Sequence, residues 1–112
     1  MFSTEVAAAN EGFVSTLSAD EDLAEIVHMF VDELPSRVTQ LLNSLEDHQL
    51  GEVARFAHQL KGAGGSYGYP QLTPVAARVE VLAKQFANEM TIRSAIDDLV
   101  NVVNKIRAAA RR

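Results

Sequence analysis

Apolar residues recur along most of this chain at the three- and four-residue spacing of amphipathic helices, and no stretch shows the two-residue alternation of a strand. The longest pattern places six of them on one helical face: Leu23, Ile26, Val27, Phe30, Val31 and Leu34. The same phase resumes after Pro35 at Val38, Leu41, Leu42 and Leu45. Because a new helix would start in an arbitrary phase, the pattern predicts one long helix that bends at Pro35, despite a cost of about 3 kcal/mol.

Three further segments have an inner apolar face. The first carries Leu50, Val53, Ala57, Leu60 and Gly64, the second Val75, Val79, Leu82 and Phe86, and the third, from near Thr91, carries Ile92, Ile96, Leu99, Val103 and Ile106. Thr73 and Pro74 suit the start of the second of these helices, although it can also begin nearer Gln71. Phe13, Val14 and Leu17 indicate a short N-terminal helix. The pattern therefore predicts an all-α, antiparallel four-helix bundle with an additional short N-terminal helix, as a single domain over residues 1–112.

The composition narrows the classes of function. There is no cysteine, so thiol catalysis and thiolate metal sites are excluded. Neither a signal peptide nor an apolar stretch of about 20 residues is found, and we expect a cytoplasmic protein without membrane contact. Residues 1–52 hold 11 acids and one base, whereas residues 53–112 hold four acids and nine bases. With an overall charge of −5 and two tyrosines, nucleic-acid binding is not expected, and the basic half is either a solvated surface or a patch for an acidic protein.

The glycine run at residues 62–68, Gly-Ala-Gly-Gly-Ser-Tyr-Gly, needs an explanation, because each glycine inside a helix costs about 1 kcal/mol relative to alanine. A dinucleotide-binding loop would require glycine at position 67, where Tyr67 stands, and a preceding strand. A Walker loop would require Gly-Lys-Ser/Thr at its end, which is missing. The run is therefore not predicted to hold a nucleotide.

If residues 50–67 stay helical, His58 points about 140° away from the core direction at Val53, at about 100° per residue. The positions around the imidazole are small: Ala54, Gly62 and Gly65. Lys61 lies within reach of a group bound to His58, and Gly64 faces inward, where it allows close helix packing. A surface histidine usually has no role, but here two glycines clear the space around one.

This arrangement suits nucleophilic chemistry at a phosphoryl group. A neutral imidazole offers one ring nitrogen as a nucleophile, and the Lys61 ammonium can offset phosphoryl charge. The open surroundings let a second protein bring the group within about 3 Å of that nitrogen. His28 and His48 lack such surroundings, and the three histidines do not have metal-ligand spacing, so no metal site is predicted.

The stretch His58-Gln59-Leu60-Lys61-Gly62-Ala63, followed by Gly68, resembles the signature of histidine-containing phosphotransfer (HPt) domains. The similarity extends to Glu33-Leu34-Pro35 and to Ala77-Arg78-Val79-Glu80, over roughly residues 13–90. It implies a four-helix bundle of a two-component phosphorelay, with His58 phosphorylated, Lys61 in support and Gly62 providing clearance. Some relatives place a glutamine beside the histidine, and Glu80 stands at the matching position. There it either accepts an imidazole N–H or faces solvent.

The resemblance further implies a phosphoryl carrier without kinase activity or a cofactor of its own. The aspartate and the Mg²⁺ would belong to a partner, the receiver domain of a response regulator or hybrid kinase. Docking would use Arg55, Gln59 and Lys61 around exposed small residues, on a protein expected to be monomeric. The competing hypothesis is a helical interaction module that is not phosphorylated. A self-contained hydrolase is disfavoured, because Ser66 lies about 80° around the helix from His58.

Overall fold

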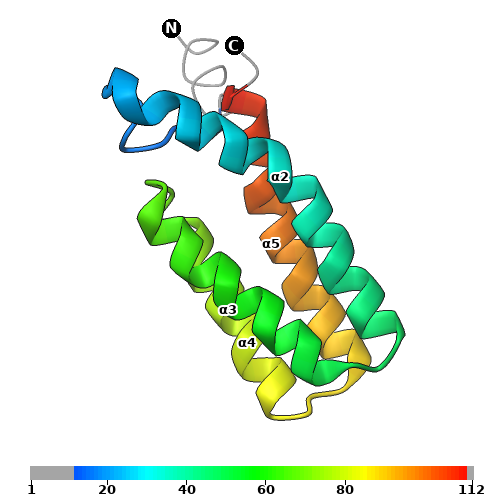
Figure 1. Cartoon of the computed structure of the whole chain (residues 1–112). Helices are drawn as coiled ribbons and strands as arrows, with labels where there is room; N and C mark the ends of the chain where they lie inside the picture. Colours follow the sequence, from blue (N-terminus) through cyan, green and yellow to red (C-terminus); the bar gives the residue numbers. More distant parts are fainter. Residues whose placement is uncertain (1–11, 111–112) are drawn as a thin grey trace, which may run out of the picture.

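The structure is a computed structural model that describes residues 12–110. It contains four helices: α2 (Glu21–Glu46), α3 (Leu50–Ser66), α4 (Leu72–Lys84) and α5 (Glu89–Ala110). Short connections reverse the chain between them, and contacts join α2 to α3, α3 to α4, α4 to α5 and α5 back to α2 (Figure 1). Residues 12–110 contain no strand, so the predicted all-α bundle of four helices is confirmed. None of these four helices is both long and apolar enough to cross a lipid bilayer.

The long first helix of the bundle, α2, continues through Pro35, as its apolar pattern predicts. It begins after Asp20, whose Oδ1 accepts a hydrogen bond from the Asp22 amide at 2.9 Å. Figure 1 shows its axis changing direction along its length, which fits the clash between a proline ring and the preceding turn. The bend lets both halves of α2 turn their apolar residues toward the other helices.

The core lies between the four inner faces. Its largest fully buried side chains come from all four helices: Leu34, Leu41, Leu45, Val53, Leu60, Leu72, Val79, Ile92, Ile96, Leu99 and Ile106. Helix α4 buries Leu72, Ala76 and Val79 and leaves Val75 and Leu82 only partly buried. The prediction that Phe86 is internal is wrong, since its side chain is 80% exposed. The helix ends at Lys84, and Phe86 takes a φ of +56° in the reversal that follows, so helical spacing does not apply to it.

The predicted helix around residues 13–17 is also wrong, and residues 1–11 lie outside the described range. Two backbone amides of this segment bond to other elements rather than along a helix. The Phe13 amide donates to the Lys105 carbonyl at 3.1 Å, and the Thr16 amide donates to the Gly68 carbonyl at 2.8 Å. Gly68 has a φ of +80°, and a Cβ there would lie 2.5 Å from Ser15 Oγ. Glycine at this position therefore lets the N-terminal segment cross the α3–α4 connection.

Candidate functional site

Helix α3 runs unbroken from Leu50 to Ser66, through Gly62, Gly64 and Gly65. A Cβ at Gly62 or Gly65 would meet no other heavy atom within 4 Å, so both positions leave open space at the surface. A Cβ at Gly64 would instead lie 2.7 Å from Thr73 Oγ1 and 3.0 Å from the Tyr69 carbonyl oxygen. The glycines thus divide as predicted, with two of them clearing the surface and one allowing α4 to approach.

The imidazole of His58 stands on this cleared surface, with its side chain 65% exposed. Gln59 beside it is exposed as well, but Ala54, one turn earlier, is only 8% exposed and belongs to the core. The expectation that Ala54 forms part of an exposed small-residue patch is therefore wrong. Its flank of α3 is already covered within the bundle, so a partner protein has little access to it.

Glu80, on the neighbouring helix α4, contacts the imidazole of His58. Its Oε2 lies 2.9 Å from His58 Nδ1, and its side chain is only 5% exposed. The antiparallel alignment of α3 and α4 explains this contact. Gly64 packs against Leu72 and Thr73 at one end of the helix pair. Counting along both helices from there brings Glu80 level with His58. Of the two roles left open by the sequence, the carboxylate takes the one beside the imidazole rather than facing solvent.

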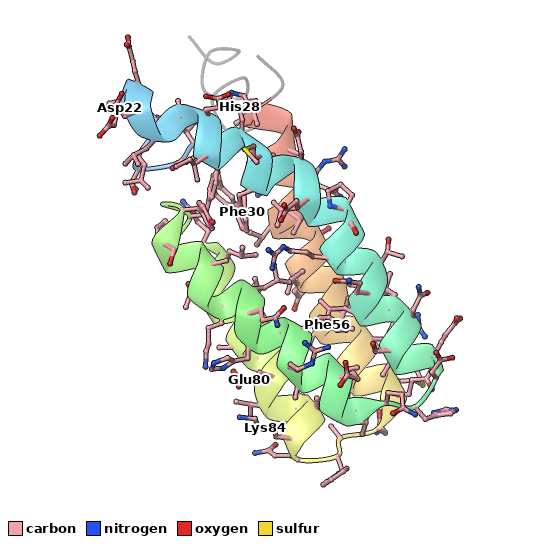
Figure 2. The ribbon with its side chains drawn as sticks, viewed as in Figure 1. Asp22, His28, Phe30, Phe56, Glu80 and Lys84 are labelled. Atoms are coloured by element: carbon pink, nitrogen blue, oxygen red, sulfur yellow. The ribbon has the colours of Figure 1, made fainter. Side chains whose placement is uncertain are left out.

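Two ammonium groups share the same carboxylate. Lys61 Nζ lies 2.7 Å from Glu80 Oε1, and Lys84 Nζ lies 3.0 Å from Glu80 Oε2. Figure 2 shows Glu80 and Lys84 projecting from the same edge of α4, next to α3. Lys84 was missed in the sequence, although its position four residues after Glu80 on one helix was a usable signal. The structure therefore brings together His58, Lys61, Glu80 and Lys84.

These contacts determine the protonation of the site. The hydrogen bond from Lys61, and next that from Lys84, lower the pKa of Glu80 to about 2, against the opposing effect of its burial. At neutral pH the carboxylate is therefore ionised and can only accept hydrogen bonds. His58 Nδ1 must then carry the proton of their contact, so in the neutral imidazole the free lone pair is on Nε2. The buried carboxylate fixes the tautomer and holds the ring in one orientation.

The other two predicted docking residues of α3, Arg55 and Gln59, lie outside this cluster. Arg55 pairs with Glu52 on its own helix, and its guanidinium lies 4.5 Å from the centre of the Phe56 ring. Gln59 lines a hollow of about 280 Å³ between α2 and α3, together with Arg37 and Phe56. Both residues are exposed on α3, but their contacts do not bring them to Glu80.

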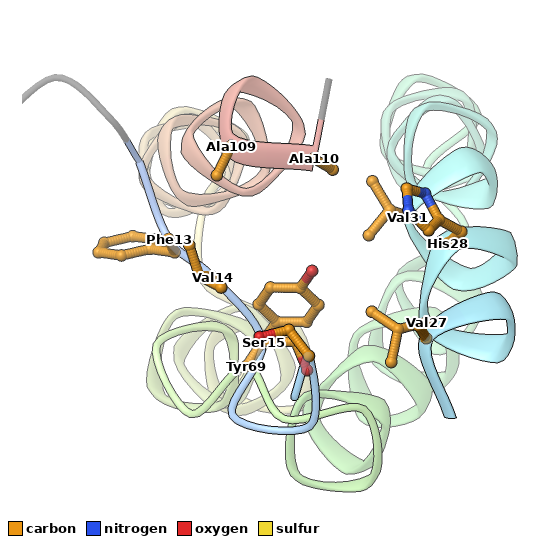
Figure 3. Close-up of a pocket in the computed structure, with 11 residues that line it drawn as sticks. Phe13, Val14, Ser15, Val27, His28, Val31, Tyr69, Ala109 and Ala110 are labelled. Carbon is orange, nitrogen blue, oxygen red and sulfur yellow. The ribbon is translucent and has the colours of Figure 1, made fainter. Parts of the chain in front are cut away.

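A second hollow, of about 210 Å³, lies at the end of the bundle where the N-terminal segment crosses it. Figure 3 shows the Tyr69 ring at its centre, with Val27 and Val31 on one side and Phe13 on the other. His28 is at its edge, but none of the described residues that line it carries a carboxylate. Neither this hollow nor the one at Gln59 is lined by His58. The imidazole therefore projects from an open surface, where another macromolecule can reach it.

Comparison with known proteins was made at the level of families, curated proteins and solved structures. No curated protein and no solved structure gave a significant match. The family model described as the Hpt domain matches residues 25–109, which span most of the chain and include all four residues of the cluster. On this match, and in agreement with its four-helix fold, the chain belongs to the Hpt domain family.

Proposed function

We propose that this protein carries a phosphoryl group on Nε2 of His58, accepting it from the aspartyl phosphate of a receiver domain and passing it to another receiver. HPt domains are phosphocarriers of two-component signalling. The observation that carries the proposal is the exposed imidazole whose Nδ1 donates to a buried, ionised carboxylate. That contact leaves Nε2 as the nucleophile on the open side of the ring.

The transfer needs no loss of a proton. The Nε2 lone pair attacks phosphorus, the bond between phosphorus and the aspartate oxygen breaks, and its electron pair stays on the aspartate carboxylate. Nδ1 keeps its proton throughout, so the phosphorylated ring carries a positive charge. Glu80, 2.9 Å from Nδ1, is placed to stabilise that charge as it develops. Passing the group on reverses each step.

Lys61 is the supporting cation of this proposal. Lys61 stands about one turn after His58 on α3, and its ammonium forms an ion pair with Glu80 Oε1. From there the ammonium can reach oxygens of a phosphoryl group held at Nε2. The chain supplies the histidine and its electrostatic surroundings, while the receiver brings the aspartate and Mg²⁺. Gly62 and Gly65 leave space for the receiver to approach. The exposed Arg55 and Gln59 are proposed to contact the receiver at the edge of the interface. An interface of this kind is small and transient.

The test uses a receiver domain phosphorylated beforehand and incubated with the protein in the presence of Mg²⁺. The wild type and the control His28→Gln become labelled with acid-labile phosphate, while His58→Gln does not. Equal labelling of His58→Gln would reject the proposal. Binding of receivers without transfer by any of them would instead favour the interaction module that is not phosphorylated.

A further inference from the structure

We propose that Lys84 is a second phosphoryl-binding residue, held beside His58 by Glu80 until the phosphoryl group arrives. This inference rests on the proposed function and adds a second residue of α4, after Glu80, to the site. Its starting point is that one carboxylate oxygen has two partners. Glu80 Oε2 lies 2.9 Å from His58 Nδ1 and 3.0 Å from Lys84 Nζ. The ammonium of Lys84 is therefore a direct neighbour of the imidazole.

The two lysines approach the imidazole from opposite directions along the bundle. In the antiparallel α3–α4 pair, Gly64 meets Leu72 and His58 meets Glu80, so Lys84 comes level with Ala54, one turn before the histidine. Lys61 lies about one turn after it. A phosphoryl group on Nε2 has three oxygens, and cations on two sides of the ring can bind different ones.

Before phosphorylation, the charges of Lys61, Lys84 and Glu80 sum to a net positive charge that favours binding of an anion. Two ammonium groups face one carboxylate, so the cluster carries a positive charge that Glu80 alone does not balance. The incoming phosphoryl oxygens supply the missing negative charge. Lys84 is also the more exposed of the two cations, since its side chain is 64% exposed against 34% for Lys61. It can leave Glu80 Oε2 for the phosphoryl group, after which that oxygen serves Nδ1 alone.

A purely structural role for Lys84 makes a different prediction. A lysine in the last turn of α4, four residues after a glutamate, stabilises the helix by a small amount through its charge. In that case its loss would lower stability and leave the transfer rate unchanged. The two roles are therefore separated by a rate measured on folded protein.

The experiment compares Lys84→Gln and Lys84→Arg with Lys105→Gln, a control that removes a charge at the Phe13 ring. The phosphoryl donor is phosphoramidate, which has no protein surface. Nε2 forms its bond to phosphorus, the phosphorus–nitrogen bond of the donor breaks, and the donor nitrogen leaves as ammonia. ³¹P NMR follows the product. We expect Lys84→Gln to be slower than wild type by about two- to fivefold, with Lys84→Arg and Lys105→Gln close to wild type.

The same variants are then tested with a phosphorylated receiver and Mg²⁺, after circular dichroism has shown that they are folded. Slower transfer of Lys84→Gln with both donors supports phosphoryl binding. A defect with the receiver alone makes Lys84 a docking contact and overturns the inference, as does a wild-type rate with both donors. If the wild type itself is not labelled on His58 by either donor, the proposed function fails, and this outcome is distinct from the others.

Discussion

Glu80 Oε2 lies 2.9 Å from His58 Nδ1, although the two residues are 22 positions apart and belong to different helices. The side chain of Glu80 is almost fully buried, whereas that of His58 is largely exposed. The pair therefore joins the interior of the α3–α4 interface to the surface that a partner reaches. The carboxylate sets which ring nitrogen is free, while Gly62 and Gly65 keep that nitrogen accessible.

The first prediction concerns stability at acidic pH. The hydrogen bonds from Lys61 and Lys84 hold the pKa of Glu80 at about 2, below its ordinary value of 4.5. A lowered pKa contributes stability above pH 4.5 that is lost as the pH falls through 2. Between these values the free energy of unfolding of the wild type should fall more than that of Glu80→Gln, by at most about 3 kcal/mol. Urea denaturation at pH 7, 4 and 2.5 measures this, and parallel curves for the two proteins would contradict it.

The second prediction separates stability from activity at Gly62. Replacement by glutamine should raise the free energy of unfolding by about 0.5–1 kcal/mol, because glutamine is a better helix former and its Cβ meets nothing within 4 Å. The same side chain occupies the space beside His58, so transfer from a receiver should slow at least about tenfold, which corresponds to about 1.4 kcal/mol in the barrier. Gly51→Gln, also in open space on α3 but two turns before His58, is the control. It should leave the transfer rate unchanged, and an unchanged rate in Gly62→Gln as well would argue against the clearance role.

The third prediction distinguishes two adjacent glycines. Gly64→Ala places a Cβ 2.7 Å from Thr73 Oγ1 and 3.2 Å from Leu72 Cβ, so it should destabilise the protein by about 1–3 kcal/mol by forcing α3 and α4 apart. Gly65→Ala has open space and should instead be stabilising. Thermal unfolding of the two variants tests the difference in sign. A gain of stability in both would mean that Gly64 is not needed for the helix contact.

The fourth prediction concerns Phe86, which has a φ of +56° after the end of α4 and a side chain that is 80% exposed. The left-handed conformation costs a residue with a Cβ about 1–2 kcal/mol, and glycine avoids this cost. Phe86→Gly should therefore be more stable than wild type by up to about 1 kcal/mol, since little burial is lost. Gln85→Gly, at a φ of −88°, should be less stable. A destabilised Phe86→Gly in chemical denaturation would show that the ring contributes packing.

The sequence predicted what depends on local spacing. The apolar residues on both sides of Pro35 share one helical phase, which predicted the continuous α2. The angular positions of residues relative to Val53 predicted that His58 is exposed and that Gly64 faces inward. What it left open depends on how α3 and α4 are aligned. The burial of Glu80, and with it the recruitment of Lys84, follows from a register set by contacts such as that of Gly64 with Leu72, which no local pattern contains.

The two wrong elements have a related cause. Phe13 and Leu17 are spaced as in a helix and do pack against the core, but two backbone amides of this segment donate to the carbonyls of Lys105 and Gly68. Tertiary contacts thus replaced the helix that the local spacing indicated. Phe86 continued an apolar spacing past the point where α4 stops. In both cases the apolar residues keep a helical spacing in the sequence where the backbone is not helical.

The central claim is that Nε2 of His58 is the nucleophile because Glu80 holds the proton on Nδ1. The most direct test is a two-dimensional ¹H–¹⁵N NMR spectrum of the histidine side chains, recorded before and after phosphorylation by a receiver with Mg²⁺. The account predicts that His58 carries its proton on Nδ1 in the resting protein and the phosphoryl group on Nε2 afterwards. A phosphoryl group on Nδ1 of His58, or on His28 or His48, would contradict it.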